Sequence, residues 1–164
     1  MRDNHATLYL VCGKIAAGKS TLAHRLAAEP ETILVSEDRW LSALYPTEIN
    51  TLQDYVKYSG RLRGVVGEHV ESLLRLGLSV ALDFPANTVN LRQWMRSIFE
   101  GAGAVHELHF LDVPDALCKE RLKRRNDEGS HDFAPSEADF DIIIRYFETP
   151  TAEEGFNVIV HPQA

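Results

Sequence analysis

Cysteine pairs and metal-binding patterns are scarce in this sequence, and their scarcity excludes several classes of protein. The chain has two cysteines, Cys12 and Cys118, which lie far apart and form no C-x-x-C pair. This spacing predicts neither a disulfide framework nor a zinc site, so we expect both thiols to be buried as small apolar groups. His106 and His109 are three residues apart on an expected strand and should therefore point to opposite faces, which argues against a shared metal ion.

Long apolar runs and an excess of positive charge are also missing. No segment approaches the roughly 20 apolar residues of a membrane-spanning helix, and the first six residues lack the apolar core of a signal peptide. The formal net charge is −7 and the isoelectric point is about 5.5. Because nucleic-acid affinity needs clustered positive surface, we expect no nucleic-acid partner. Because apolar segments of the required length are missing, we expect a cytoplasmic protein with no membrane partner.

The 164 residues are the size of one domain, in which apolar runs alternate with helical patterns. The expected strands are 7–12, 32–35, 78–83, 105–111 and 157–160. The expected helices are 21–28, a long one ending at 76, 91–100, 116–126, and a last one that opens with a capping-box pattern at 136–139. This alternation predicts a single α/β domain over 1–164, with a parallel sheet covered on both faces and ligands at the carboxyl ends of its strands.

The segment from Gly13 to Ser20 reads GKIAAGKS and lies between an apolar run and a helical pattern. In that strand-to-helix context, the spacing G-x-x-x-x-G-K-S predicts a loop whose backbone N–H groups surround the phosphates of a nucleoside triphosphate. Lys19 should reach the outer phosphates, and the Ser20 hydroxyl should bind Mg²⁺.

Two aspartates follow expected strands and should face the same cleft. Asp83 has the form of a Walker B aspartate, which holds Mg²⁺ directly or through water; the alternative is a turn residue ahead of Phe84. Asp38 is placed to orient and deprotonate an attacking hydroxyl, and the alternative is that it caps a short helix carrying Trp40 and Leu41.

Three arginines precede a polar segment rich in helix breakers. Arg121 and Arg125 are four residues apart and share a helix face, with Arg124 beside them. Planar guanidinium groups can clamp the negative charge that spreads over a transferring phosphoryl group. We therefore predict a mobile lid at about 127–135 that closes over the triphosphate, while the neighbouring lysines should form a solvated face. The alternative is that the arginines belong to that solvated face too.

These motifs resemble those of the small P-loop kinases, in particular the predicted kinases of the AAA_33 type, whose relatives include chloramphenicol phosphotransferase, zeta toxin, polynucleotide kinase and gluconate kinase. The resemblance covers nearly the whole chain and rests on GKIAAGKST at 13–21, SEDRW at 36–40 and ERLKRRN at 120–126. It implies a three-layer α/β/α P-loop NTPase fold, a five-stranded parallel sheet in the order 2-3-1-4-5, and a small lid that includes 131–133.

The motifs and the resemblance together indicate which residues hold ATP and Mg²⁺ and which act in catalysis. The expected ATP ligands are Gly13, Lys14, Ala16, Ala17, Gly18, Lys19, Ser20, Thr21, Arg121, Arg124 and Arg125. The expected catalytic residues are Lys19, Asp38, Arg121 and Arg125, and the expected metal ligands are Ser20 and Asp83.

We predict an ATP-dependent phosphotransferase that moves the γ-phosphate of Mg·ATP to a hydroxyl of a small molecule, as a monomer or homodimer. Tyr55, Tyr58, Arg61 and Arg63 lie where such kinases place their acceptor-binding insert, and as a group they are the expected acceptor wall; the alternative is that each is a surface residue without a ligand contact. The alternatives are a P-loop ATPase or nucleotide switch acting on a protein partner, or a nucleic-acid 5'-hydroxyl kinase. A GTPase is not expected because the chain lacks an N-K-x-D motif.

Overall fold

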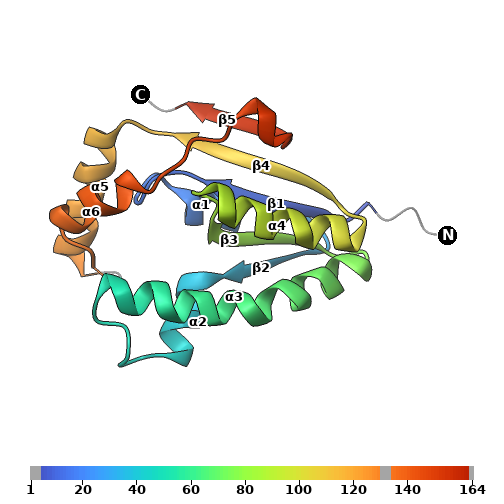
Figure 1. Cartoon of the computed structure of the whole chain (residues 1–164), viewed down its shortest axis with the longest axis horizontal. Helices are drawn as coiled ribbons and strands as arrows, with labels where there is room; N and C mark the ends of the chain where they lie inside the picture. Colours follow the sequence, from blue (N-terminus) through green and yellow to red (C-terminus); the bar gives the residue numbers. More distant parts are fainter. Residues whose placement is uncertain (1–4, 130–133, 163–164) are drawn as a thin grey trace.

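A central parallel sheet of five strands organises the molecule (Figure 1). The computed structural model describes residues 5–129 and 134–162. The strands are β1 (Thr7–Cys12), β2 (Thr32–Ser36), β3 (Ser79–Pro85), β4 (Val105–Asp112) and β5 (Val158–Pro162), in the order β2-β3-β1-β4-β5. The helices are α1 (Lys19–Ala27), α2 (Glu37–Leu44), α3 (Leu52–Arg75), α4 (Val89–Ala102), α5 (Asp115–Glu128) and α6 (Glu137–Arg145), with a 3₁₀ turn η1 (Ala152–Glu154) before β5.

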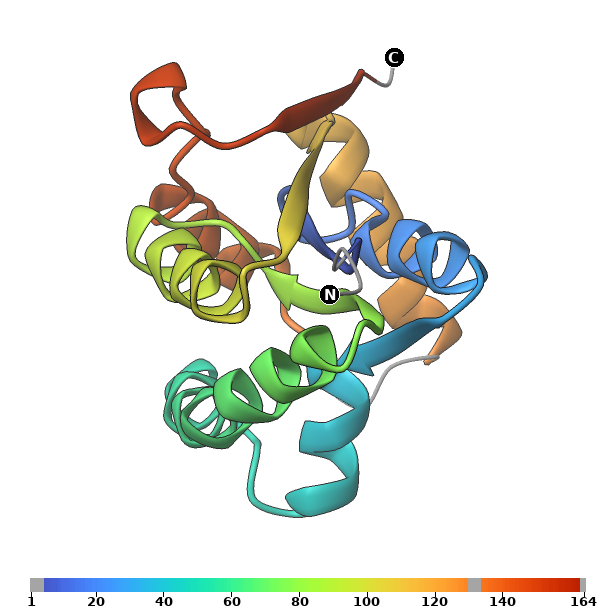
Figure 2. The same cartoon turned by 90° about the vertical axis from the view of Figure 1, so that its right-hand side faces the viewer.

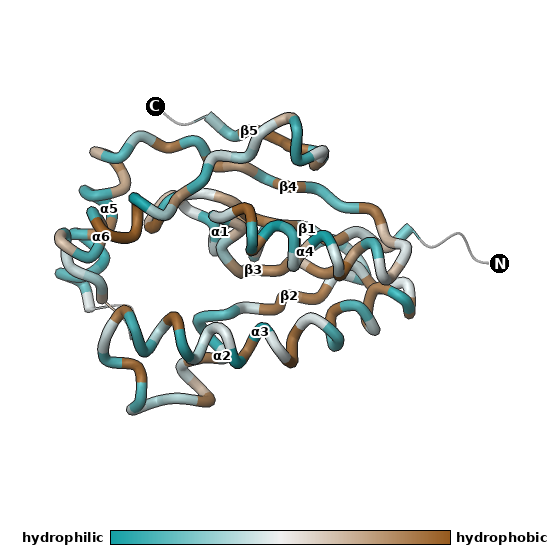
Figure 3. The backbone as a smooth tube through the Cα atoms, in the orientation of Figure 1, coloured by the Kyte–Doolittle hydropathy of each residue, from teal (hydrophilic) through white to brown (hydrophobic). Residues whose placement is uncertain are grey.

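Helices cover both faces of the sheet, so the predicted α/β/α P-loop NTPase fold and its strand order are confirmed (Figure 2). The helices α1 and α5 lie on one face, and α3 and α4 lie on the other. Leu8 and Leu10 of β1 are fully buried toward the α3 and α4 face, while Val11 packs with α1 and α5. Because β1 is covered on both faces, it reads as the continuous apolar run that predicted it (Figure 3).

Both cysteines are buried, as predicted, and neither forms a disulfide. His106 stacks on Phe99, whereas His109 contacts His161, so the two histidines have separate neighbours. No group of three or more metal-ligating side chains occurs among the residues that the structure describes. Within the same ranges, none of the helices has the length and apolar character needed to cross a membrane.

The structure extends several elements beyond their predicted bounds. Helix α1 begins at Lys19 because Gly18, with φ 104°, turns the chain directly into the helix. Strand β3 runs to Pro85, past the expected end at Asp83. Helix α5 continues to Glu128, so the first part of the expected lid is helical. The expected lid segment 131–133 lies outside the described residues.

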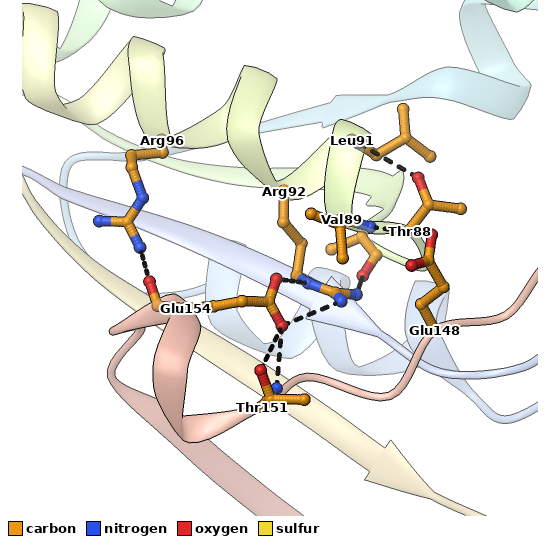
Figure 4. Close-up of polar contacts among 9 residues, drawn as sticks. Thr88, Val89, Leu91, Arg92, Arg96, Glu148, Thr151 and Glu154 are labelled. Carbon is orange, nitrogen blue, oxygen red and sulfur yellow. Dashed lines mark hydrogen bonds and ion pairs between the residues drawn. The ribbon is translucent and has the colours of Figure 1, made fainter.

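A buried ion pair joins helix α4 to the 3₁₀ turn that precedes β5 (Figure 4). The side chain of Arg92 on α4 has no exposed surface, and its Nε and Nη2 donate to Glu154 Oε1 and Oε2 at 2.7 and 3.2 Å. Arg92 Nη1 also donates to the Ala86 carbonyl at 2.9 Å, and Glu154 Oε2 accepts from the Thr151 N–H at 2.9 Å. These contacts join α4, the turn after β3 and the turn before β5.

Removing one member of this pair should destabilise the fold strongly. In Glu154→Ala the Arg92 guanidinium stays buried without its counter-charge, which costs about 3–5 kcal/mol of unfolding free energy. The matched control is Glu100→Ala, which breaks the exposed pair that Arg96 and Glu100 form at 3.4 Å and should cost no more than about 0.5 kcal/mol. Urea unfolding of both variants measures the difference, and equal losses would contradict a structural role for the buried pair.

Candidate active site

The loop between β1 and α1 turns back on itself in a way that its two glycines allow. Ala16 and Gly18 have positive φ angles of 63° and 104°, and the Ala17 N–H donates to the Lys14 carbonyl at 3.0 Å. A Cβ atom at Gly13 would lie 3.1 Å from Ala17 Cβ and 3.2 Å from both Leu111 Cβ and the Leu111 carbonyl oxygen. A side chain at Gly13 would therefore force Ala17 or the Leu111 backbone to shift by a few tenths of an ångström, while Gly18 supplies a left-handed backbone conformation that favours glycine.

The Lys19 ammonium group lies inside this loop. Its Nζ donates to the carbonyl oxygens of Gly13 at 2.6 Å and Lys14 at 2.9 Å. Burial lowers the pKa of Lys19, while the nearby Cys12 thiol and the Asp83 carboxylate act to raise it. A half-buried cation at the N-terminus of α1, where the first helical N–H groups have no partner within the helix, is suited to bind a polyphosphate.

Asp83 stands next to Ser20, as expected for a metal-binding pair. The pairing of β1 with β3 shifts register between Leu10 and Val11, and Asp83 lies at this irregularity, inside β3 rather than in a turn. Burial raises the pKa of Asp83, whereas a hydrogen bond with the Ser20 side chain lowers it. A carboxylate and a hydroxyl are ligands that Mg²⁺ accepts, so the donor set fits this ion.

Asp38 is exposed in the first turn of α2, and the structure corrects the alternative that it caps this helix. The cap is Ser36, whose Oγ accepts from the Arg39 N–H at 3.3 Å. The Asp38 carboxylate contributes to the pKa shifts of Lys19, Asp83 and Arg125, so the four groups lie within electrostatic range of one another. The exposed Asp38 side chain can therefore meet a ligand bound beside Lys19 and Asp83.

The three arginines of α5 separate into two environments. Arg121 Nη1 donates to the Ala17 carbonyl of the phosphate loop at 3.4 Å. Burial lowers the pKa of Arg125, and the nearby Asp38 carboxylate offsets only part of that shift. The buried Arg125 Nε has no hydrogen-bond partner within the described part of the chain. Arg124 instead forms an exposed pair with Glu120 at 3.3 Å, so its expected place among the ATP ligands has no support in this geometry.

Two side chains near the loop are engaged in ways that the sequence did not indicate. The Asn87 amide bonds to Gly13 from both of its ends, since Oδ1 accepts from the Gly13 N–H at 3.0 Å and Nδ2 donates to the Gly13 carbonyl at 2.8 Å. The Lys14 ammonium pairs with Asp115 at the start of α5, and the Lys14 carbonyl accepts from Lys19 within the loop. Asn87 follows β3 without any spacing signal and was missed for that reason.

The expected acceptor wall lies largely at the contact between α2 and α3. The hydroxyls of Tyr55 and Ser59 donate to the Glu37 carboxylate, the latter at 2.9 Å, and Arg63 Nη1 donates to Ser59 Oγ at 2.7 Å. Tyr58 packs on Tyr45 with ring centroids 4.2 Å apart. Tyr55 and Ser59 thus hold α3 against the helix that carries Asp38, while Arg63 bonds to Ser59 within α3.

Glu37 should make stability depend on pH near neutrality. Burial raises its pKa from 4.5 to about 7, and the hydrogen bonds from Tyr55 and Ser59 reduce that shift. A raised carboxyl pKa means that stability is highest while the group is protonated in both states, falls as pH rises from about 4.5 to about 7, and levels off above that. Glu37→Gln removes this loss, so its unfolding free energy relative to the parent should increase between pH 5 and 8 by at most about 3 kcal/mol.

Urea unfolding at several pH values tests this expectation. The exposed residue Glu29 provides the control variant Glu29→Gln, whose difference from the parent should change little over the same range. If the curves of the parent and Glu37→Gln stay parallel, Glu37 is not the group responsible.

Known structures share this arrangement of sheet and helices. A crystal structure of Chaetomium thermophilum Kti12 in complex with ADP-AlF3 covers 94% of this chain and 88% of its own, at a TM-score of 0.75 and 16% identity. The structure of a putative kinase from Chloroflexus aurantiacus aligns with 99% of this chain and 87% of its own chain, with a TM-score of 0.75 and 18% sequence identity. The structure of a gluconokinase from Sinorhizobium meliloti aligns with 99% of this chain and 84% of its own chain, with a TM-score of 0.61 and 16% sequence identity. At these identities the similarity shows the fold alone.

Sequence similarity gives a narrower result. The chain is 26% identical over 148 residues to a protein named KTI12 homolog from Arabidopsis thaliana, covering 87% of this chain and 47% of that protein. The chain therefore spans about half the length of this curated relative. Residues 8–150 match the AAA_33 family, described as an AAA domain. Since that match covers most of the sequence, the chain belongs to the AAA_33 family of P-loop nucleotide-binding domains.

Proposed function

We propose that this protein is a kinase that transfers the γ-phosphate of Mg·ATP to a hydroxyl group of a small molecule. The observation that carries the proposal is that Lys19 lies inside the phosphate loop and Asp83 hydrogen-bonds with Ser20, while the Asp38 carboxylate interacts electrostatically with Lys19, Asp83 and Arg125. These residues come from α1, α2, β3 and α5, so ionisable groups far apart in the sequence interact electrostatically in the folded protein. Phosphoryl transfer needs positive groups on the transferring oxygens and an acceptor for the proton of the nucleophile.

Each group has a separate role in the proposed reaction. The phosphate loop and Lys19 hold the phosphates, and Ser20 with Asp83 hold Mg²⁺, which neutralises charge on the β- and γ-phosphates when bound. Asp38 accepts the proton of the acceptor hydroxyl as its oxygen forms the new bond to phosphorus. The bond from phosphorus to the β-phosphate oxygen breaks, and ADP leaves.

The arginines of α5 supply the remaining positive charge. Arg121 already contacts the phosphate loop, and the buried Nε of Arg125 is available to a ligand oxygen. A guanidinium group presents two N–H donors in one plane, which suits phosphate oxygens better than a point charge does.

A second candidate is an ATPase whose hydrolysis acts on a protein partner. The similarity to proteins named Kti12 supports it, because one of those structures contains ADP-AlF3. The two functions differ in where the phosphate goes. Labelled ATP incubated with a panel of small alcohols gives labelled alcohol phosphate for a kinase, and only labelled inorganic phosphate for an ATPase.

Replacing Asp38 should separate chemistry from nucleotide binding. In Asp38→Asn the carboxylate that accepts the proton is lost, so transfer to the best alcohol of the panel should fall at least about 100-fold. The dissociation constant of Mg·ATP should change by less than about threefold, since Asp38 is not among the proposed metal ligands. Asp112→Asn, which changes another exposed aspartate at the end of a strand, is the control. A large loss of Mg·ATP affinity in Asp38→Asn would assign Asp38 to the metal instead.

The two environments of the α5 arginines give a matched pair of variants. Arg125→Lys keeps the charge but removes the planar donor pair, so the transfer rate should fall about tenfold or more while ATP affinity changes little. Arg124→Lys should retain the parent rate because Arg124 pairs with Glu120 on the surface. Single-turnover kinetics measure the rate, and equal effects of the two variants would remove Arg125 from the site.

A further inference from the structure

A cavity of about 150 Å³ lies between the phosphate loop and α6. Ile15 of the loop faces it from one side, Phe140, Ile143 and Ile144 of α6 face it from another, and Phe147 follows α6 at its edge. We name it the α6 cavity. Figure 3 shows hydrophobic residues concentrated on α6 at this end of the molecule. The cavity thus brings apolar side chains next to the loop that holds phosphate.

The polar side chains that line the α6 cavity near the loop are already paired. The Asn87 amide is bonded at both ends to Gly13, and the Lys14 ammonium pairs with Asp115. A polyol placed here would give up water and meet few groups able to replace those hydrogen bonds, at a cost of about 1–3 kcal/mol for each unpaired hydroxyl. The lining therefore favours an apolar occupant.

The size of the cavity narrows the choice further. A volume of about 150 Å³ is enough for a group of the size of a benzene ring, and because the α6 cavity is partly open to solvent the rest of the ligand can extend out of it. We propose that the α6 cavity receives a ring-sized apolar group of the phosphate acceptor, so that the acceptor is an aromatic or branched aliphatic alcohol rather than a sugar, a sugar acid or a nucleic-acid end.

The position of the cavity assigns it to the acceptor instead of to the nucleotide base. Pro85, Asn87 and Thr88 line it, two to five residues after Asp83, and the Asn87 side chain is bonded to Gly13 of the phosphate loop. The cavity therefore adjoins the loop just beyond the strand that carries Asp83, whose carboxylate together with the Ser20 hydroxyl would hold Mg²⁺ at the reacting end of the triphosphate. The proposal rests on the proposed function for the identity of the occupant, but binding to the cavity can be measured without any transfer.

The binding test uses benzyl alcohol as the probe and sorbitol as the polar control. Methyl resonances of the parent protein are followed while each compound is added. Benzyl alcohol should shift the methyl signals of Ile15, Ile143 and Ile144 with a dissociation constant of about 1–10 mM. Sorbitol should shift none of them. Absence of shifts with benzyl alcohol, or equal shifts with sorbitol, would overturn the proposal.

A matched pair of variants tests the location. Ile143→Trp fills the cavity and should weaken benzyl alcohol binding at least tenfold. Ile142→Trp places the same side chain at the neighbouring position of α6, which is 41% exposed and does not line the cavity, so binding should stay within twofold of the parent. Equal binding by the two variants would place the probe elsewhere.

Nucleotide competition separates the acceptor from the base. Saturating Mg·ADP should leave the benzyl alcohol dissociation constant within about twofold, because the two ligands occupy different places. Displacement of benzyl alcohol by ADP would assign the cavity to adenine and overturn the proposal.

In the labelled ATP assay, phosphate transfer to sorbitol but not to aromatic alcohols would also overturn it. Probe binding without labelling of any alcohol would instead reject the kinase function while leaving the apolar cavity established.

Discussion

The ammonium group of Lys19, half buried within its own loop, is the interaction on which the rest of the site depends. A cation taken out of water needs nearby oxygens, and the carbonyls of Gly13 and Lys14 supply them. They can do so only because the chain reverses through the positive φ angles of Ala16 and Gly18. The same reversal leads directly into α1, so one backbone conformation positions both the Lys19 cation and the helix N-terminus that favours a bound anion.

The loop is also held from outside by the turn after β3. Asn87 bonds both backbone groups of Gly13, and the Ala86 N–H donates to the Val11 carbonyl at 2.9 Å. Ala86 in turn receives a hydrogen bond from Arg92, which Glu154 neutralises. A continuous series of polar contacts thus runs from the turn before β5 to the phosphate loop, and it connects the folding of the last strand with the geometry of the site.

The parts of this molecule that could be predicted from sequence are those with a local signal. The phosphate loop has fixed spacing, β1 is a continuous apolar run, and α6 opens with a capping box that the structure contains at Ser136 and Asp139. Asn87 and Gly13 are 74 residues apart, and Arg92 and Glu154 are 62 apart, so no local pattern could reveal either contact. Glu37 escaped notice because its burial depends on α3 packing over α2.

Helices α5 and α6 pack as a pair, which links the arginines to the α6 cavity. Lys119 of α5 bonds to Asp141 of α6 at 2.9 Å, and Phe140 packs with Cys118 and Leu122 in one core cluster. An occupant of the cavity would contact α6 and so bias the placement of the helix that carries Arg121 and Arg125. If that occupant is the acceptor, its binding and the completion of the positive charge around the γ-phosphate become coupled. Such coupling would favour transfer over hydrolysis, because the arginines reach their positions when an alcohol rather than water is next to phosphorus.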